Sequence, residues 1–153
     1  MGGPTDLRMH PDAPVRLFTV DESNALVPLL DEVFRRLDPK LARLRELKEL
    51  VEDAEAYWGD GLASAPADDR ERYSGMLQEH ADLERSVQGD IDEVRSLGCE
   101  FKDLQRGLID FPARVDGEIA YLCWQRGEER VGWWHTLEGG FAGRKALRAE
   151  AEH

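Results

Sequence analysis

The chain has 153 residues, with 20 Lys or Arg against 32 Asp or Glu, and its formal net charge is −12. The length predicts one domain with its own hydrophobic core, and the negative charge disfavours nucleic acid and anionic membranes as partners, because their phosphate groups would be repelled. Two cysteines are too few for a disulfide framework, and no leader or membrane-spanning apolar run is evident, so we expect a cytoplasmic protein.

The domain organisation follows from changes in composition along the chain. Residues 1–16 are rich in Gly and Pro and hold few apolar anchors, which predicts a flexible N-terminal arm. Residues 17–147 are expected to form a single domain, with a helical hairpin at 17–98 and a β-rich subdomain at 99–147 that contains three of the four tryptophans. Residues 148–153 are expected to be a short tail.

A helix start is predicted at Thr19, three residues before Glu22, because each side chain can cap the backbone N–H of the other residue. Apolar residues then recur at the heptad spacing that is typical of a coiled-coil seam: Leu30, Leu37, Leu44, Val51 and Trp58. Pro39 interrupts this pattern without changing its phase, so we predict a kinked but continuous helix there.

A second helix is predicted after a chain reversal at residues 59–66, where Gly, Ser and Pro are dense. Its apolar rows continue to Gly98, a natural left-handed cap, so the two helices should form an antiparallel hairpin. His80 and Asp90 fall within the predicted seam, where an unpaired charge would be costly. We expect His80 to bond to a neighbour, with ligand binding as the alternative, and Asp90 to point outward while Ile91 fills the seam.

The pattern changes to alternation after Gly98 and predicts strands near residues 108–111, 118–125 and 130–135, preceded by an extended segment. With a turn at 126–129, Cys123 would face Gly132, and His135 would share a face with Glu118. The predicted fold class is α+β, mainly α: a long antiparallel coiled-coil hairpin followed by a small antiparallel β-ribbon of about three strands, packed at one end.

The segment from Tyr121 to His135 contains three tryptophans, one cysteine and a terminal histidine. The tryptophans have a structural explanation, since each can bury on the order of 200 Å² against the helices. Imidazole and carboxylate donors together suit zinc, manganese or iron, so we predict a divalent metal site whose ligands are His135, Glu138, Glu118 and Asp110. The alternatives are acid–base chemistry and a histidine bonded to one carboxylate.

Further ligand-binding residues are expected around this site: Asp103, Trp124, Trp134 and Arg144. Glycines at 139–143 should let the tail turn back over the sheet, where Arg144 would pair with a carboxylate such as Asp110. Cys99 and Cys123 are expected to be small buried hydrophobes. No catalytic motif is present, so no catalytic residue is predicted.

Two segments resemble a known family: FTVDESNALVPLL near the start, and LGCEFKDLQRGLIDFPARVDGEIAYLCWQRGEERVGWWHTLEGGFAGR in the second half. From about Leu17 to Arg144 the chain is similar to the small prokaryotic family known as domain of unknown function 2203. The resemblance implies a compact bacterial protein with no established activity, and it supplies no catalytic residue. It also implies that the sheet region carries function rather than the hairpin.

Three functional hypotheses follow. The first is a non-enzymatic binding module with a His/carboxylate pocket for a divalent metal or a small ligand. The second is a structural or interaction protein, whose long helices build a homodimer or bind another protein. The third is a hydrolase that uses His135 with a carboxylate.

Overall fold

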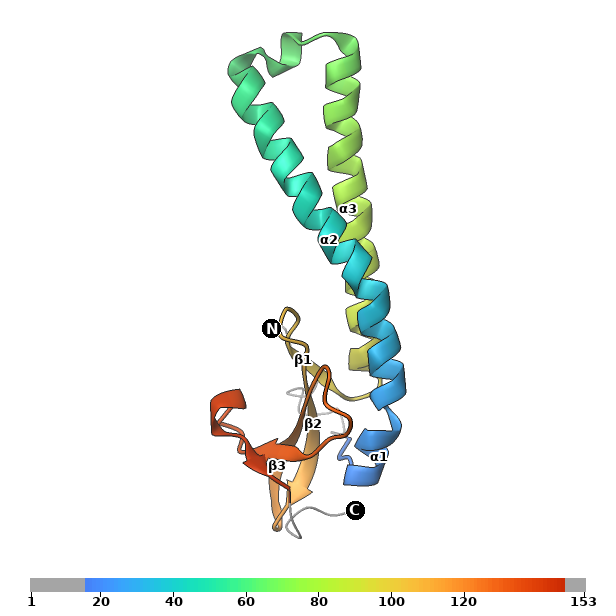
Figure 1. Ribbon diagram of the computed structural model, residues 1–153, viewed down its shortest axis with the longest axis vertical. Helices are drawn as coiled ribbons and strands as arrows, with labels where there is room; N and C mark the ends of the chain where they lie inside the picture. Colours follow the sequence, from blue (N-terminus) through green and yellow to red (C-terminus); the bar gives the residue numbers. More distant parts are fainter. Residues whose placement is uncertain (1–15, 148–153) are drawn as a thin grey trace. The chain divides into compact units, whose positions relative to one another are not determined.

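The computed structural model describes residues 16–147, so the predicted tail and all of the predicted arm except Arg16 lie outside the described residues. The elements in chain order are α1 (Val20–Ala25), α2 (Val27–Trp58), η2 (Gly59–Ser64), α3 (Ala67–Ser96), β1 (Glu100–Asp103), β2 (Leu108–Val115), β3 (Glu118–Gln125), β4 (Trp133–His135), η3 (Phe141–Gly143) and β5 (Lys145–Ala146) (Figure 1). Long helices followed by an antiparallel sheet confirm the predicted α+β, mainly α class. None of the described helices is long and apolar enough to cross a membrane.

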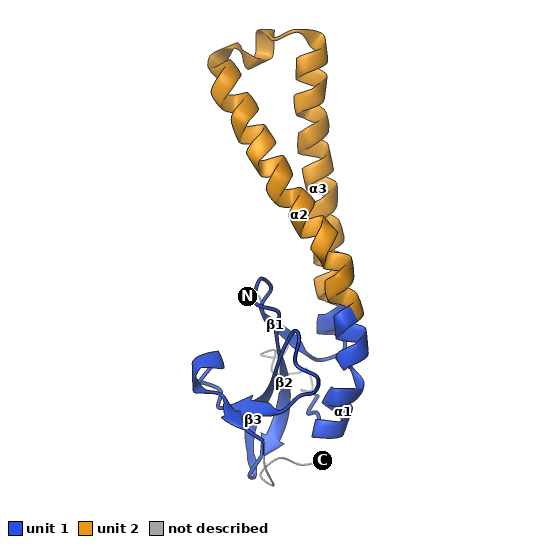
Figure 2. Cartoon of the chain, viewed as in Figure 1, with its two compact units in different colours: residues 1–31, 93–153 blue, residues 32–92 orange. Residues whose placement is uncertain are grey.

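The chain divides into two compact units (Figure 2). Of the described residues, 16–31 and 93–147 form the sheet unit and 32–92 form the hairpin unit. The start of α2 and the end of α3 therefore belong with the strands, so this division differs from the predicted boundary at residue 98.

The sheet is an antiparallel meander of five strands in the order β1-β2-β3-β4-β5, where the sequence predicts about three. The bounds of β3 are those predicted, whereas β2 extends four residues beyond Phe111 to Val115. Pro112 is accommodated within β2, and its carbonyl accepts a hydrogen bond from the backbone N–H of Phe18. β1 and β5 are short edge strands of four and two residues.

One face of the sheet forms the core of the sheet unit. Apolar side chains alternate along β2 and β3 and are buried there: Ile109, Phe111, Ala113, Val115, Ala120, Leu122 and Trp124. Phe18, which precedes the N-cap of α1, packs edge-on against Phe111 with ring centroids 5.2 Å apart. The predicted capping box is confirmed, since Thr19 and Glu22 accept each other's backbone N–H groups at the start of α1.

The predicted register between β3 and β4 is wrong by one residue. Tyr121 pairs with His135 and Cys123 pairs with Trp133, whereas the sequence predicts Cys123 opposite Gly132. Because the strand period is two, this slip places His135 on the Cys123 face and not on the Glu118 face. The turn differs as well: the side chain of Glu128 accepts the backbone N–H of Gln125 and its carbonyl accepts the indole N–H of Trp124, so β3 pairs with β4 only as far as Cys123.

The hairpin unit contains most of α2 and α3. The helix α2 runs through Pro39 without interruption, which confirms the predicted continuous helix. The predicted reversal is confirmed as well, because the 3-10 helix η2 and Ala65–Pro66 separate the two long helices. The buried apolar residues of this unit are few: Val33, Phe34, Leu37, Leu47, Ala65 and Val87.

Asp90 is buried in the hairpin unit, so the expectation that it points outward is wrong. Its carboxylate bonds to Lys40 at 2.6 Å and to Arg36 at 3.2 Å, and these two cations remove the cost of an unpaired buried charge. His80 lies close to a neighbour, as expected, because its Nδ1 is 3.5 Å from the Glu84 carboxylate one turn later.

In the sheet unit, a buried backbone N–H depends on the side chain of Asn24 for its hydrogen bond. The backbone N–H of the buried Val131 donates to Asn24 Oδ1 at 2.7 Å. We expect Asn24→Ala to lower the free energy of unfolding by about 1–3 kcal/mol, because a buried donor is left unsatisfied. Urea titration followed by tryptophan fluorescence measures the loss. Asn24→Asp keeps the acceptor and should lose less, and equal stability of all three proteins would contradict this role.

Candidate metal-binding site

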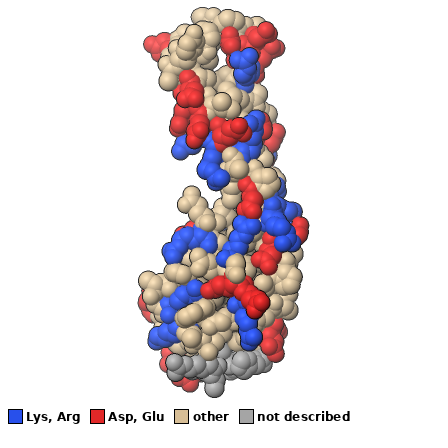
Figure 3. Space-filling view, in the orientation of Figure 1, with Lys and Arg blue, Asp and Glu red and all other residues tan. Residues whose placement is uncertain are grey.

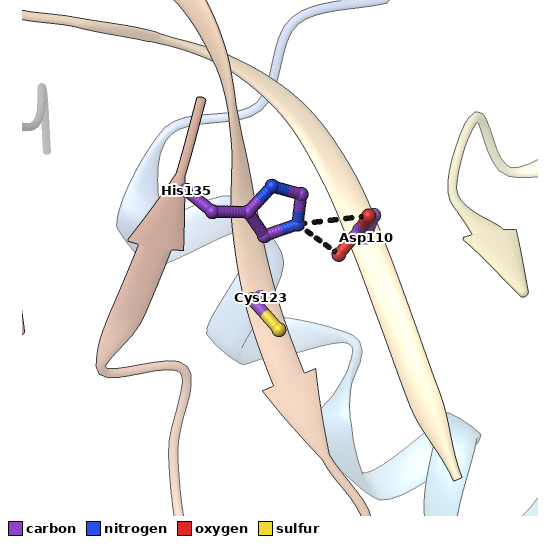
Figure 4. Close-up of side chains that lie close together, drawn as sticks. All are labelled: Asp110, Cys123 and His135. Atoms are coloured by element: carbon purple, nitrogen blue, oxygen red, sulfur yellow. Dashed lines mark hydrogen bonds and ion pairs between the residues drawn. The ribbon is translucent and has the colours of Figure 1, made fainter. Parts of the chain in front are cut away.

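Three neighbouring strands bring Asp110, Cys123 and His135 together on the second face of the sheet (Figure 4). Asp110 of β2 pairs directly with Cys123 of β3, and His135 of β4 pairs with Tyr121, two residues before Cys123. The oxygen, sulfur and nitrogen atoms of the three side chains lie within 4.8 Å of one another. All three residues are at most 2% exposed, so they form one buried cluster of metal-ligand types.

The protonation of His135 follows from its hydrogen bonds. Nδ1 lies 2.7 Å from the carbonyl oxygen of Thr136, which can only accept, so Nδ1 carries a proton. Nε2 lies 3.0 Å from both carboxylate oxygens of Asp110. One further proton must therefore lie between Nε2 and Asp110, on either the ring or the carboxyl group.

Burial controls the other two ionisable groups of the cluster. Desolvation raises the pKa of Asp110 above its usual range, and the neighbouring His135 partly opposes this effect. Desolvation also raises the pKa of the Cys123 thiol to about 12, and the adjacent Asp110, to which the thiol hydrogen-bonds, adds to the shift. The thiol is therefore protonated at neutral pH, which disfavours a role as a nucleophile in this state.

A hollow of about 200 Å³ lies beside the cluster. Its lining includes the three cluster residues together with Lys102, Asp103, Leu108, Gly140 and Phe141. Asp103, predicted to contact a ligand, is thus near the cluster, although its Oδ1 accepts the backbone N–H of Arg106 at 2.9 Å. Phe141 follows Gly140, whose φ of 62° favours glycine, so the predicted turn of the tail brings an aromatic ring to the hollow.

The structure brings together only part of the predicted ligand set. Asp110 and His135 meet as predicted, whereas Glu118 and Glu138 are exposed and line a second hollow of about 400 Å³, together with Trp134. The one-residue change of register explains the separation of Glu118, because it moves His135 to the face opposite Glu118. Among the described residues, the indole nitrogen of Trp134 has no hydrogen-bond partner.

The remaining two predicted contact residues lie elsewhere. Trp124 is fully buried in the core face and donates its indole N–H to the carbonyl of Glu128. Arg144 pairs with a carboxylate as expected, but the carboxylate is that of Glu128 at 3.0 Å and not that of Asp110, and its guanidinium also donates to the carbonyl of Cys123 at 3.3 Å.

Cys123 was missed as a candidate ligand, although the sequence contains a signal for it. The predicted strands at 108–111 and 118–125 already place a cysteine and an aspartate on adjacent antiparallel strands. A single cysteine in an apolar strand is nevertheless usually a small core residue, and Cys123 is indeed buried. Only the pairing of Asp110 with Cys123 distinguishes the two possibilities.

Fold and site together define an α+β protein with a buried Asp–Cys–His cluster on an antiparallel sheet. The family model described as "Uncharacterized conserved protein (DUF2203)" matches residues 16–147, so the chain belongs to this family and the resemblance is confirmed. Neither a curated protein nor a solved structure matches the chain.

The thiol of Cys123 should make stability fall at alkaline pH. Its pKa is about 12 in the folded chain against 9.0 ordinarily, so the folded state keeps a proton that the unfolded state loses. The free energy of unfolding that the protonated thiol contributes is fully present below pH 9.0 and is lost as pH rises toward 12.

Denaturant titrations from pH 8 to 11 measure this loss. Above pH 9 the unfolding free energy of the wild type should fall by about 1.4 kcal/mol per pH unit more than that of Cys123→Ser. Parallel pH profiles of the two proteins would contradict the raised pKa.

Proposed function

We propose that this protein is a binding module that holds one divalent transition metal ion with Asp110, Cys123 and His135. The observation that carries the proposal is the convergence of three ligand types from three strands, with donor atoms within 4.8 Å of one another. Strands of one sheet hold side chains more rigidly than loops do, so the donors are placed before a metal binds.

The surroundings of His135 support a ligand role. Metal-bound histidines commonly donate their second ring N–H to a backbone carbonyl, which fixes the tautomer. The Nδ1–H of His135 donates to the Thr136 carbonyl at 2.7 Å, so Nε2 is the nitrogen directed at the cluster. Asp110 also faces Nε2, and a metal ion would replace the proton between them.

The donor set favours zinc or iron over manganese. Thiolate sulfur is a soft donor that suits zinc and iron, whereas manganese prefers oxygen ligands. Zinc takes four ligands in most sites, and three protein ligands leave one position for water or a small ligand. The hollow of about 200 Å³ beside the cluster supports such an open position.

Metal content tests the proposal directly. Protein purified without chelator should contain about one metal ion per chain by elemental analysis. Either His135→Ala or Cys123→Ala should lose at least about nine-tenths of the bound metal, because only two of the three protein ligands remain. Cys99→Ala truncates the other buried cysteine, which lies outside the cluster, and should retain the metal. Glu138→Gln should retain it as well. Wild-type protein that takes up no metal, even after incubation with zinc, would disprove the proposal.

Proton release gives a second, independent test. Metal binding should displace about two protons at neutral pH, one from the Cys123 thiol and one shared by Asp110 and His135, since ligands bind metals in deprotonated form. Affinity should therefore rise with pH. Isothermal titration calorimetry in buffers of different ionisation enthalpy counts the protons. Release of no proton would indicate binding at surface carboxylates and would contradict the assigned ligands.

A further inference from the structure

An exposed apolar strip lies on α2 in the hairpin unit. Leu50 is 41% exposed and Tyr57 is 79% exposed, and Ala54 lies between them. These residues have the spacing i, i+4 and i+7, so their side chains share one face of the helix. The strip is therefore a continuous apolar surface of two helical turns.

This strip is separate from the packed seam of the hairpin. Leu47, three residues before Leu50, is fully buried, while Leu50 is largely open. The ring of Tyr57 contacts that of the adjacent Trp58 edge-on, with centroids 5.0 Å apart, yet most of its surface remains exposed. Folding of the hairpin therefore leaves much of the apolar area of the strip in contact with water.

Acidic side chains border the strip along one side. Residues 49–71 contain eight Asp or Glu and one Arg. Asp53 is exposed and lies three residues after Leu50 and four before Tyr57, at the edge of the strip, and the exposed Glu49 lies four residues before Asp53. Figure 3 shows acidic side chains on this part of the hairpin, beside uncharged surface. The partner that fits must be both apolar and basic.

We propose that this strip is a docking surface for an amphipathic helix with basic flanks, supplied by another protein. Helical partners bind such faces through anchors at i, i+4 and i+7, and the acidic border selects a basic helix through charge complementarity. A second copy of this chain does not fit this role, because it would bring the same acidic residues to the interface and like charges would repel.

A designed peptide tests the surface. The probe is a fluorescein-labelled helical peptide with Leu on one face and Lys on the other, and its binding is followed by fluorescence anisotropy at 0.15 M salt. The double variant Leu50→Ser/Tyr57→Ser should bind at least about tenfold more weakly than the wild type, since exposed aromatic anchors dominate such interfaces. Ile119→Ser is the matched control, because Ile119 of the sheet unit is 44% exposed but lies outside the strip. It should bind as the wild type does.

Two further measurements make the test decisive. The same peptide with Glu in place of Lys should show no binding, and circular dichroism should confirm that both variants keep their helical content. Equal affinity of the double variant and the wild type would mean attraction by bulk charge alone, and would overturn the proposal. A dimer by light scattering that Leu50→Ser/Tyr57→Ser abolishes would also overturn it, because the occupant would then be a second copy.

Discussion

The pairing of β3 with both of its neighbours is the constraint on which the candidate site depends. Asp110 meets Cys123 because β2 and β3 are in register along their full length, and His135 joins them because β4 pairs at Tyr121. A shift of one residue on either side would move a ligand to the opposite face. On the β4 side the pairing ends at Cys123, because the N–H of Gln125 is bound by the Glu128 carboxylate instead of by β4.

The cluster places three ionisable side chains on a buried face of the sheet. Asp110, Cys123 and His135 occupy positions where apolar side chains would stabilise the sheet without any need for partners. Their hydrogen bonds satisfy one another, but burial still raises the pKa values of Asp110 and Cys123, so the deprotonated forms that bind a metal are disfavoured without one. A divalent cation would supply the positive charge that those deprotonated forms lack. Such departures from a purely apolar core are concentrated at functional sites.

Much of the fold could be predicted from local signals. The capping box at Thr19, the continuity of α2 through Pro39 and the bounds of β3 depend on neighbouring residues in the sequence, and the structure confirms them. The register of β4 could not be predicted, because the turn before β4 makes contacts that a local pattern does not reveal: the Gln125 N–H bonds to the side chain of Glu128, and the Val131 N–H bonds to Asn24, more than 100 residues away. The register decides whether His135 shares a face with Asp110 or with Glu118, so the loss of Glu118 from the site could not be predicted either.

A ligand would meet buried groups in the sheet unit and exposed groups in the hairpin unit. In the sheet unit the reactive groups are at most 2% exposed, so a metal must compete with protons inside a low-dielectric environment, and selectivity follows from the type of donor. On the hairpin the relevant groups are already in water, and Tyr57 at 79% exposure contributes little to the stability of the folded chain. The hydrophobic effect favours burial of this ring only when another surface covers it. The neighbouring carboxylates oppose a partner of like charge, so the same few residues determine both the strength of docking and the sign of the charge that is accepted.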